Sequence, residues 1–581
     1  MKQSRTPFSL QYGIVGAILI GIVLKVCLVQ FSKNKVLTKF EGVSFYISQP
    51  TDCNFSLYYS FSDKFQNNQV LLAESVSNKE LRFNFPKSNQ LPTSLRLDFG
   101  NEPLCALPNL DSLSINYKGN SKMIQKEDLF QHIIGNSASI YLNKNDKALK
   151  LNVNSDPFDP YIIFDPLLKI VLDEDAFVNR LILLLPFLLL LGWHLKNVSI
   201  KTLQLPDVLC IIFIVCIPLK IAWTTLAALL IGLFGIMNAI RKKEYNFKNK
   251  EGLLLIGVFI VFLIIGRPTS LKIIDHHLAL ILFFIISSTF SFNWAVVTKF
   301  YIQFILFLNA ALVTSGVAFL INFPTVFGLD IWNYFSEIKF FSGNVREWLY
   351  YDHAVFLTFF GLIGLLSLHK HSEILQSKKI LLLYHLLLIG LIFLIGARIS
   401  LLIYLVFIVN MYFDFKPKKR LIINTIVFSS SAVLLFLMIG KIDVYRDGLW
   451  KVSWEAIINK PYFGYGLGSS DKVLHSTTLM SQAKVNIPTI LNHSHNQYLT
   501  FLLELGFIGS CAIISCVMLY LKHKAQYLNI TMVLFIFGLC YVFLTESILQ
   551  TSKPLFVLCF LFYLISKMPS SITFNELDKQ A

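Results

Sequence analysis

Residues 252–267 read Gly252-Leu-Leu-Leu-Ile-Gly-Val-Phe-Ile-Val-Phe-Leu-Ile-Ile-Gly-Arg267, an apolar run that ends on a cation. A transmembrane helix needs about 20 predominantly apolar residues, and runs near that length recur along the chain. Hydrophobic residues make up 55% of the 581 residues, and the mean hydropathy is +0.60. This composition is typical of a multi-pass membrane protein and predicts a mainly α fold, a polytopic transmembrane helical bundle.

Hydropathy along the chain predicts about fourteen membrane spans. They are expected at residues 12–30, 180–195, 206–221, 223–240, 252–267, 276–292, 295–320, 352–369, 379–396, 399–414, 421–439, 497–520, 528–546 and 554–567. Lys2 and Arg5 are expected to hold the N-terminus in the cytoplasm. Because successive spans cross the membrane in opposite directions, the basic clusters then fall on the cytoplasmic side as well. These clusters lie at 241–243, 378–379, 416–420 and 522–524. The formal charge of +16 therefore indicates topology, and no nucleic-acid partner is expected.

The chain divides into four expected segments. Residues 1–31 form an N-terminal anchor span, which is retained because no small-residue cleavage site follows it. Residues 32–175 carry short alternating runs broken by Pro, Gly and Asn, which predict a small β-rich extracytoplasmic domain. Residues 176–567 hold the transmembrane domain with a periplasmic loop at 440–496, and residues 568–581 are a cytoplasmic tail.

The β-rich domain contains two of the nine cysteines, Cys53 and Cys105. Because disulfides form outside the cytoplasm, this pair is a candidate disulfide, and two separate thiols are the alternative. The role of the domain stays open between carbohydrate contact and a structural one.

Two histidines stand where the 440–496 loop meets an apolar run, in His493-Ser-His495-Asn496-Gln-Tyr498. Imidazole exchanges protons near neutral pH and can act as a general base. Asn496 and Tyr498 could orient the ring or bind sugar hydroxyls; helix capping and an aromatic belt are the alternatives. No ligand spacing typical of zinc accompanies the histidines, so no metal site is expected.

Two arginines fall on the same outer side under this topology. Arg398 lies at a helix junction, where it could bind phosphate, pair with a carboxylate or extend to the interface. Arg446 is flanked by Asp443 and Asp447, so an ion pair within the loop competes with anion binding. The turn from Glu546 to Lys553 faces the same side.

The loop also predicts a short helix and a flexible turn. A short helix with one apolar, aromatic face is predicted from the spacing of Leu449, Val452, Trp454 and Ile457. Such a helix could lie in the membrane interface. Three glycines at alternate positions within 461–470 allow tight backbone turns. No phosphate loop or dinucleotide fingerprint is present, so no cofactor is expected.

The spaced elements occur in one order. They are Arg446-x-x-Leu-Trp450, Pro461-x-x-Gly-x-Gly-x-Gly468, His495-Asn-x-Tyr-Leu499 and Glu504-Leu-Gly506-x-x-Gly509. This order resembles the core of the O-antigen ligase and O-antigen polymerase superfamily over residues 180–567. Thr545-Glu-Ser-Ile-Leu-Gln550 and His353 are similar to ligases of the Bacteroides type.

The resemblance implies a GT-C-like helical bundle in the bacterial inner membrane. It implies an inverting, metal-independent glycosyltransferase that moves a glycan from undecaprenyl diphosphate to a lipid A-core or another glycan or protein acceptor. In this scheme His495, with His493 as the second candidate, is the base, and Arg398 and Arg446 bind the diphosphate. The rim of the site is expected to contain Asn496, Tyr498, Glu546, Lys553 and His353.

The anchor span, the outer insertion and Asp352-His353 depart from the family pattern and leave the acceptor open. A polysaccharide polymerase and a protein O-oligosaccharyltransferase remain alternatives within the superfamily. A transporter or flippase of lipid-linked glycan is the alternative from another class.

Overall fold

The computed structural model separates into two compact units, residues 1–15, 187–313 and 341–581 in one and residues 16–186 and 314–340 in the other. It describes residues 14–26, 40–47, 55–60, 70–77, 80–85, 92, 94–99, 110–117, 120–130, 132–137, 140–143, 148–151, 160–164, 204–218, 221–243, 249–327, 354–370, 378–413, 417–442, 444–476, 479, 494–524, 530–550 and 552–567. Cys53, Cys105, His353 and His493 lie outside these residues, so the candidate disulfide and two of the site residues stay predictions.

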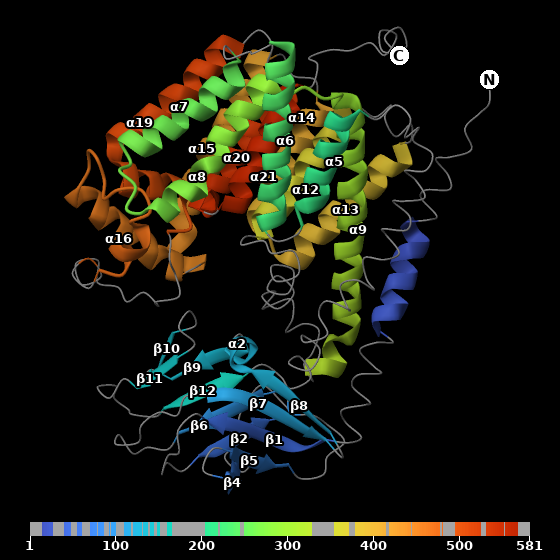
Figure 1. Cartoon of the computed structure of the whole chain (residues 1–581), viewed down its shortest axis with the longest axis vertical. Helices are drawn as coiled ribbons and strands as arrows, with labels where there is room; N and C mark the ends of the chain where they lie inside the picture. The colour runs from blue at the N-terminus through green and yellow to red at the C-terminus, as the bar shows by residue number, and fades with distance from the viewer. Residues whose placement is uncertain are drawn as a thin grey trace. The chain divides into compact units, whose positions relative to one another are not determined.

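The second unit contains a β-sandwich of two five-stranded antiparallel sheets (Figure 1). One sheet has the order β4-β5-β1-β7-β8, from Glu74–Ser77, Glu80–Asn84, Phe40–Ile47, Leu110–Tyr117 and Asn120–Gln125. The other has the order β3-β2-β6-β12-β9, from Val70–Leu72, Ser56–Ser60, Ser94–Asp98, Tyr161–Phe164 and Ile133–Asn136. A short helix, α2 (Lys126–Leu129), and a separate hairpin, β10 (Ile140–Asn143) with β11 (Ala148–Leu151), complete the region.

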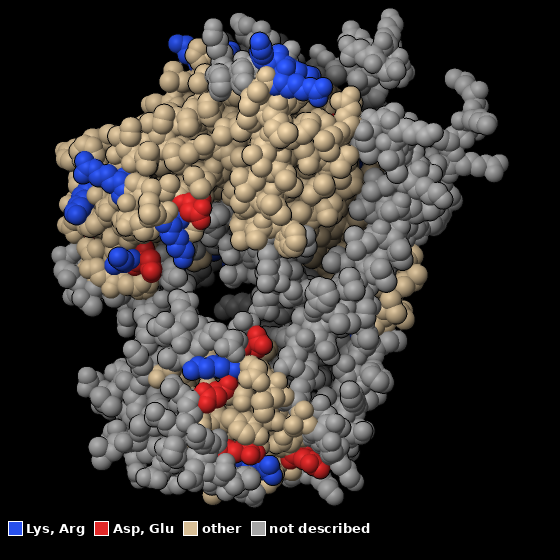
Figure 2. All heavy atoms as spheres, in the orientation of Figure 1, with Lys and Arg blue, Asp and Glu red and all other residues tan. Residues whose placement is uncertain are grey.

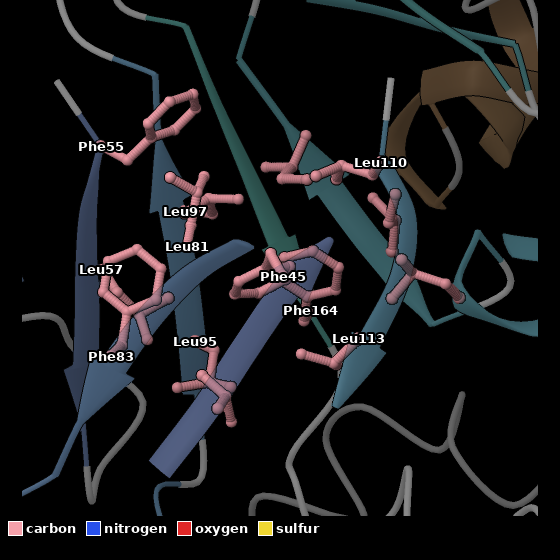
Figure 3. Close-up of a cluster of buried hydrophobic side chains, with 14 of the residues drawn as sticks. Phe45, Phe55, Leu57, Leu81, Phe83, Leu95, Leu97, Leu110, Leu113 and Phe164 are labelled. Atoms are coloured by element: carbon pink, nitrogen blue, oxygen red, sulfur yellow. The ribbon is translucent and has the colours of Figure 1, made fainter. Parts of the chain in front are cut away.

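Alternation along the strands builds the core of this sandwich. Phe45 of β1 and Phe83 of β5 point inward from one sheet, and Leu97 of β6 and Phe164 of β12 from the other (Figure 3). Phe45 and Phe164 meet across the interior with ring centroids 5.4 Å apart. The β-rich region predicted from the sequence is therefore confirmed, because every second side chain of these strands is apolar and buried.

The first unit is helical. Its helices are α5 (Leu205–Cys216), α6 (Ile221–Lys242), α7 (Lys250–Ile264), α8 (Leu271–Thr289), α12 (Ala354–Lys370), α13 (Lys378–Ile395), α14 (Arg398–Tyr412), α15 (Pro417–Ile442), α16 (Val444–Asn459), α17 (Ser470–Leu474), α19 (Gln497–Lys524), α20 (Ile530–Thr545), η3 (Ile548–Gln550) and α21 (Ser552–Ser566). Helix α9 (Trp294–Phe327) begins in this unit and ends in the other.

Four described helices are long and apolar enough to cross a membrane: Ile221–Lys242, Leu271–Thr289, Trp294–Ile321 and Gln497–His523. Other apolar helices are shorter, and the count of fourteen spans is not confirmed. Each expected span except 180–195, which lies outside the described residues, coincides with a helix. The face shown in Figure 2 has a broad uncharged surface over the helical part, with Lys and Arg toward its ends, as a membrane protein requires.

Helices α14 and α15 are joined by a short connection, and both pack against α20 (Ile530–Thr545). The amides of Asn410, near the end of α14, and Asn424, near the start of α15, bond reciprocally at 2.8 and 3.1 Å. Because this contact lies close to the short connection, Arg398 at the start of α14 and Ile442 at the end of α15 lie at the opposite, common end.

Helix α20 reaches the same end. Phe428 of α15 packs against Tyr541 of α20, with centroids 5.0 Å apart, and α16 follows directly after α15. Arg446 of α16 then contacts Thr545, the last residue of α20. The starts of α14 and α16 and the end of α20 therefore gather at one end of the bundle.

Candidate active site

A buried carboxylate at this end joins two of the residues that the sequence singled out. Glu546 follows α20 and is only 6% exposed. Its Oε1 lies 3.2 Å from Nη2 of Arg446, and its Oε2 lies 3.3 Å from Nδ1 of His495. A carboxylate this deeply buried needs cationic or hydrogen-bonding partners, and Glu546 has both kinds.

Arg446 is held by the end of α20. Its Nη1 donates to the carbonyl oxygen of Thr545 at 3.0 Å, and its Nη2 faces Glu546. Asp447, the neighbour expected to compete for it, instead pairs with Lys451 one helical turn onward at 2.7 Å. Asp443 lies outside the described residues. The guanidinium thus links α16 to the end of α20.

His495 has a backbone conformation that few residues adopt. Its φ is +51°, in the left-handed region where His, Asn and Asp are enriched among non-glycine residues. It immediately precedes the N-cap of α19, and its side chain remains 22% exposed. The ring is therefore anchored through one nitrogen and still reachable from solvent.

The backbone beside His495 is fixed from both sides. Trp450 Nε1 of α16 donates to the carbonyl oxygen of Ser494 at 3.0 Å. The backbone N–H of Asn496 donates to Ser547 Oγ at 3.1 Å, and its side-chain Nδ2 donates to Leu544 O at 3.1 Å. Thr500 Oγ1 lies 2.8 Å from Ser494 Oγ and 3.0 Å from Ser547 Oγ, which closes the network.

Asn496 and Tyr498 occupy positions that support the fold of the site. Asn496 caps α19, since its Oδ1 accepts the N–H of Leu499 at 3.1 Å. Tyr498 donates from Oη to the carbonyl oxygen of Cys540 at 3.2 Å and packs edge-on against Phe543. Both side chains therefore hold α19 against α20, and sugar contact by either stays a prediction.

Arg398 and Lys553 are less closely tied to the cluster. Arg398 is exposed at the start of α14, at the same end of the bundle, and no hydrogen bond or ion pair joins its side chain to another described residue. Lys553 is the second residue of α21, and its side chain lies outside the described part. Among the described residues, no group of three His, Cys, Asp or Glu side chains could hold a metal ion.

The apolar face predicted for α16 is partly wrong. Leu449, Val452 and Ile457 are buried against α19 with Leu503, but Trp454 is 55% exposed. At 3.6 residues per turn, Trp454 lies about 200° around the helix from Val452, so the two cannot share one face.

The glycine run and α19 form one interlocked unit. At Gly506 the helix is broken, with φ +66° and ψ −172°. The N–H groups of Phe507 and Ile508 donate to the carbonyl oxygens of Pro461 and Tyr462, at 2.7 and 3.1 Å. Across the gap, Tyr465 and Gly466 donate to the carbonyl oxygens of Leu503 and Glu504, both at 2.9 Å. The loop replaces the missing helical hydrogen bonds, so its glycines are structural.

Substitution of Gly506 by Ala should destabilise the protein by about 1–3 kcal/mol, because this backbone region is essentially restricted to glycine. A Cβ there would also overlap the backbone of Tyr462. The check is the thermal unfolding of purified protein in detergent. Gly390→Ala is the matched control, since its Cβ would meet nothing nearer than 3.8 Å; an equal melting temperature for both variants would contradict the interlock.

Sequence reasoning missed the part played by Trp450, Thr500 and Ser547. Trp450 belongs to the Arg446-x-x-Leu-Trp450 pattern, which was a signal of importance but not of its bond to Ser494. Ser547 belongs to the Thr545-Glu-Ser-Ile-Leu-Gln550 stretch, which likewise did not indicate its bond to Asn496, and Thr500 carries no pattern of its own.

Part of the chain is similar to a known family. Residues 383–514 match the model of a family described as O-antigen ligase. The matched segment contains Arg398, Arg446 and His495 and stops before Glu546. No curated protein matches the chain.

Proposed function

We propose that the protein is a membrane glycosyltransferase of the ligase and polymerase type, on the basis of the match of residues 383–514 to the O-antigen ligase family. The protein transfers a glycan from undecaprenyl diphosphate to an acceptor hydroxyl on the periplasmic face of the bacterial inner membrane. The observation that carries the proposal is the contact of His495 and Arg446 with one buried carboxylate, Glu546.

His495 is the general base. When Nδ1–H of the ring donates to Glu546, the lone pair is on Nε2, which accepts the proton of the acceptor hydroxyl. The acceptor oxygen attacks the anomeric carbon as the bond from that carbon to the diphosphate oxygen breaks. Undecaprenyl diphosphate leaves with the electron pair, and attack from the opposite side inverts the anomeric configuration.

Glu546 is a positioning residue in this scheme. It fixes the ring orientation and tautomer of His495 and stabilises the imidazolium that forms, as a carboxylate behind a catalytic histidine does in other enzymes. Arg446 balances the charge of Glu546, so the carboxylate can stay ionised although it is buried.

The leaving diphosphate requires cations, and Arg398 is an exposed cation at this end of the bundle. A guanidinium has five N–H groups, so Arg446 can bind Glu546 and a phosphate oxygen together. Both arginines therefore remain assigned to the donor, with Arg398 as the main contact. His493 remains the second candidate for the base, and Lys553 and His353 remain proposed rim residues.

The direct test is incubation of the purified protein with undecaprenyl-diphosphate glycan and candidate acceptors, with chelator present. We expect released undecaprenyl diphosphate and product at equal amounts, with no loss of rate on chelation, because the cations of the site are arginines. Movement of donor across a vesicle membrane without product would identify a flippase instead.

The same incubation separates the acceptors. Product on lipid A-core indicates a ligase, longer glycan on the carrier indicates a polymerase, and product on protein indicates an O-oligosaccharyltransferase. Absence of product with every acceptor, from protein that unfolds cooperatively, would contradict the proposed function.

A further inference from the structure

Helix α16 has a second apolar surface that the bundle does not cover. Its inner side, with Leu449, Val452 and Ala456, is fully buried against α17 and α19. On its outer side Trp454 and Ile458, one helical turn apart, are 55% and 56% exposed. A helix outside the spans that served only as a lid over the site would place polar side chains at these outer positions.

The exposed apolar surface continues past the end of the helix. Tyr462 and Phe463 are 67% and 50% exposed, and the backbone of Tyr462 bonds to Ile508 of α19. Phe507, beside it, is 61% exposed on a helix that is long and apolar enough to cross a membrane. The outer side of α16 is thus continuous with the exposed apolar surface of a candidate membrane span.

Cations border this surface. Lys460 Nζ lies 4.5 Å from the ring centroid of Tyr465, and Arg267 Cζ lies 5.7 Å from that of Phe463. Trp and Tyr beside Lys and Arg are the residues that gather at the boundary between acyl chains and headgroups, where the cations meet lipid phosphates.

We propose that the interfacial face, defined as Trp454, Ile458, Tyr462 and Phe463, is immersed in the headgroup boundary of the bilayer. Its partner is the phospholipid surface, with acyl chains against the four apolar side chains and phosphates against Lys460 and Arg267. The assignment of this surface to the periplasmic leaflet rests on the proposed function.

The same helix carries the site. Helix α16 carries four of these side chains at intervals of four residues: Arg446, Trp450, Trp454 and Ile458. In the first half of α16, Arg446 pairs with Glu546 and Trp450 donates to the carbonyl oxygen of Ser494. If the second half of α16 is fixed at the membrane interface, these two contacts in turn fix the position of His495. Arg446 and Trp454 are about 12 Å apart along the axis at 1.5 Å per residue, which keeps the cluster close to the level of lipid phosphates.

Trp454 is itself the probe. In bilayer discs, the tryptophan fluorescence of the wild-type protein minus that of Trp454→Phe gives the fluorescence of Trp454 alone. We expect this signal to be lost in phosphatidylcholine brominated close to the headgroup and to be retained with aqueous iodide. Trp450→Phe is the control on the same helix, because Trp450 is 7% exposed and neither quencher should remove its signal.

Quenching of Trp454 by iodide with no effect of bromolipid would overturn the proposal and leave the face to solvent or a protein partner. If Trp454→Phe is not recovered as folded protein, Ile458→Trp gives the same measurement as an added signal. The assay needs no substrate, so bromolipid quenching in a protein that makes no glycan product would uphold the interfacial face and refute the proposed function.

Discussion

His495→Asn is expected to lower kcat for glycan transfer by about 10²- to 10⁴-fold, the range that a positioned general base contributes. Asn tolerates the left-handed backbone that His495 adopts, at φ +51°, so the loop should keep its shape. Its amide can still hydrogen-bond Glu546, but it has no basic nitrogen to accept the hydroxyl proton. The measurement is the initial rate with lipid-linked donor and acceptor, together with KM for the donor, which should change little.

The matched control for this variant is His523→Ala. His523 is exposed near the far end of α19, the helix that follows His495, and its substitution should leave the rate unchanged. Thermal unfolding of His495→Asn close to that of the wild type separates lost chemistry from lost structure. Transfer by His495→Asn at the rate of the control would remove the general-base role.

The helices and the histidine could be predicted because each leaves a local signal. Apolar runs gave the positions of the helices, and the polar break before Gln497 marked the start of α19 with Asn496 as its cap. The glycines were assigned to structure because close turns need them, and the loop does replace the hydrogen bonds lost at Gly506.

The pairing of side chains could not be predicted in the same way. Arg446 and Glu546 are 100 residues apart, and local charge favoured Asp447, which the helix instead directs toward Lys451. Only the packing of α16 against the end of α20 decides between these carboxylates. The prediction that Trp454 shares the apolar face of α16 is wrong for a different reason. Trp454 follows Val452 by two residues, and helix geometry places it on the opposite side of α16, where it is exposed.

Glu546→Gln should lower kcat by about 10²- to 10⁴-fold, although Gln has nearly the same shape. The amide would donate to Nδ1 of His495 and favour the tautomer with its proton on Nε2, which then has no lone pair for the acceptor hydroxyl. Arg446 would also lose the charge that it balances. Glu455→Gln is the control, because it is the same substitution on α16 at a residue whose side chain has no hydrogen bond or ion pair to another described residue.

The double variant Glu546→Gln with His495→Asn tests whether Glu546 acts through the histidine. If Glu546 serves only to position the ring, its substitution has nothing further to remove once the ring is gone, so the double variant should be about as slow as His495→Asn alone. A rate lowered by the product of the two single effects would mean that Glu546 contributes independently, for example by binding the acceptor. In that case the carboxylate would belong among the groups that touch substrate, and the orientation of His495 would have to come from the backbone bonds to Ser494 and Asn496.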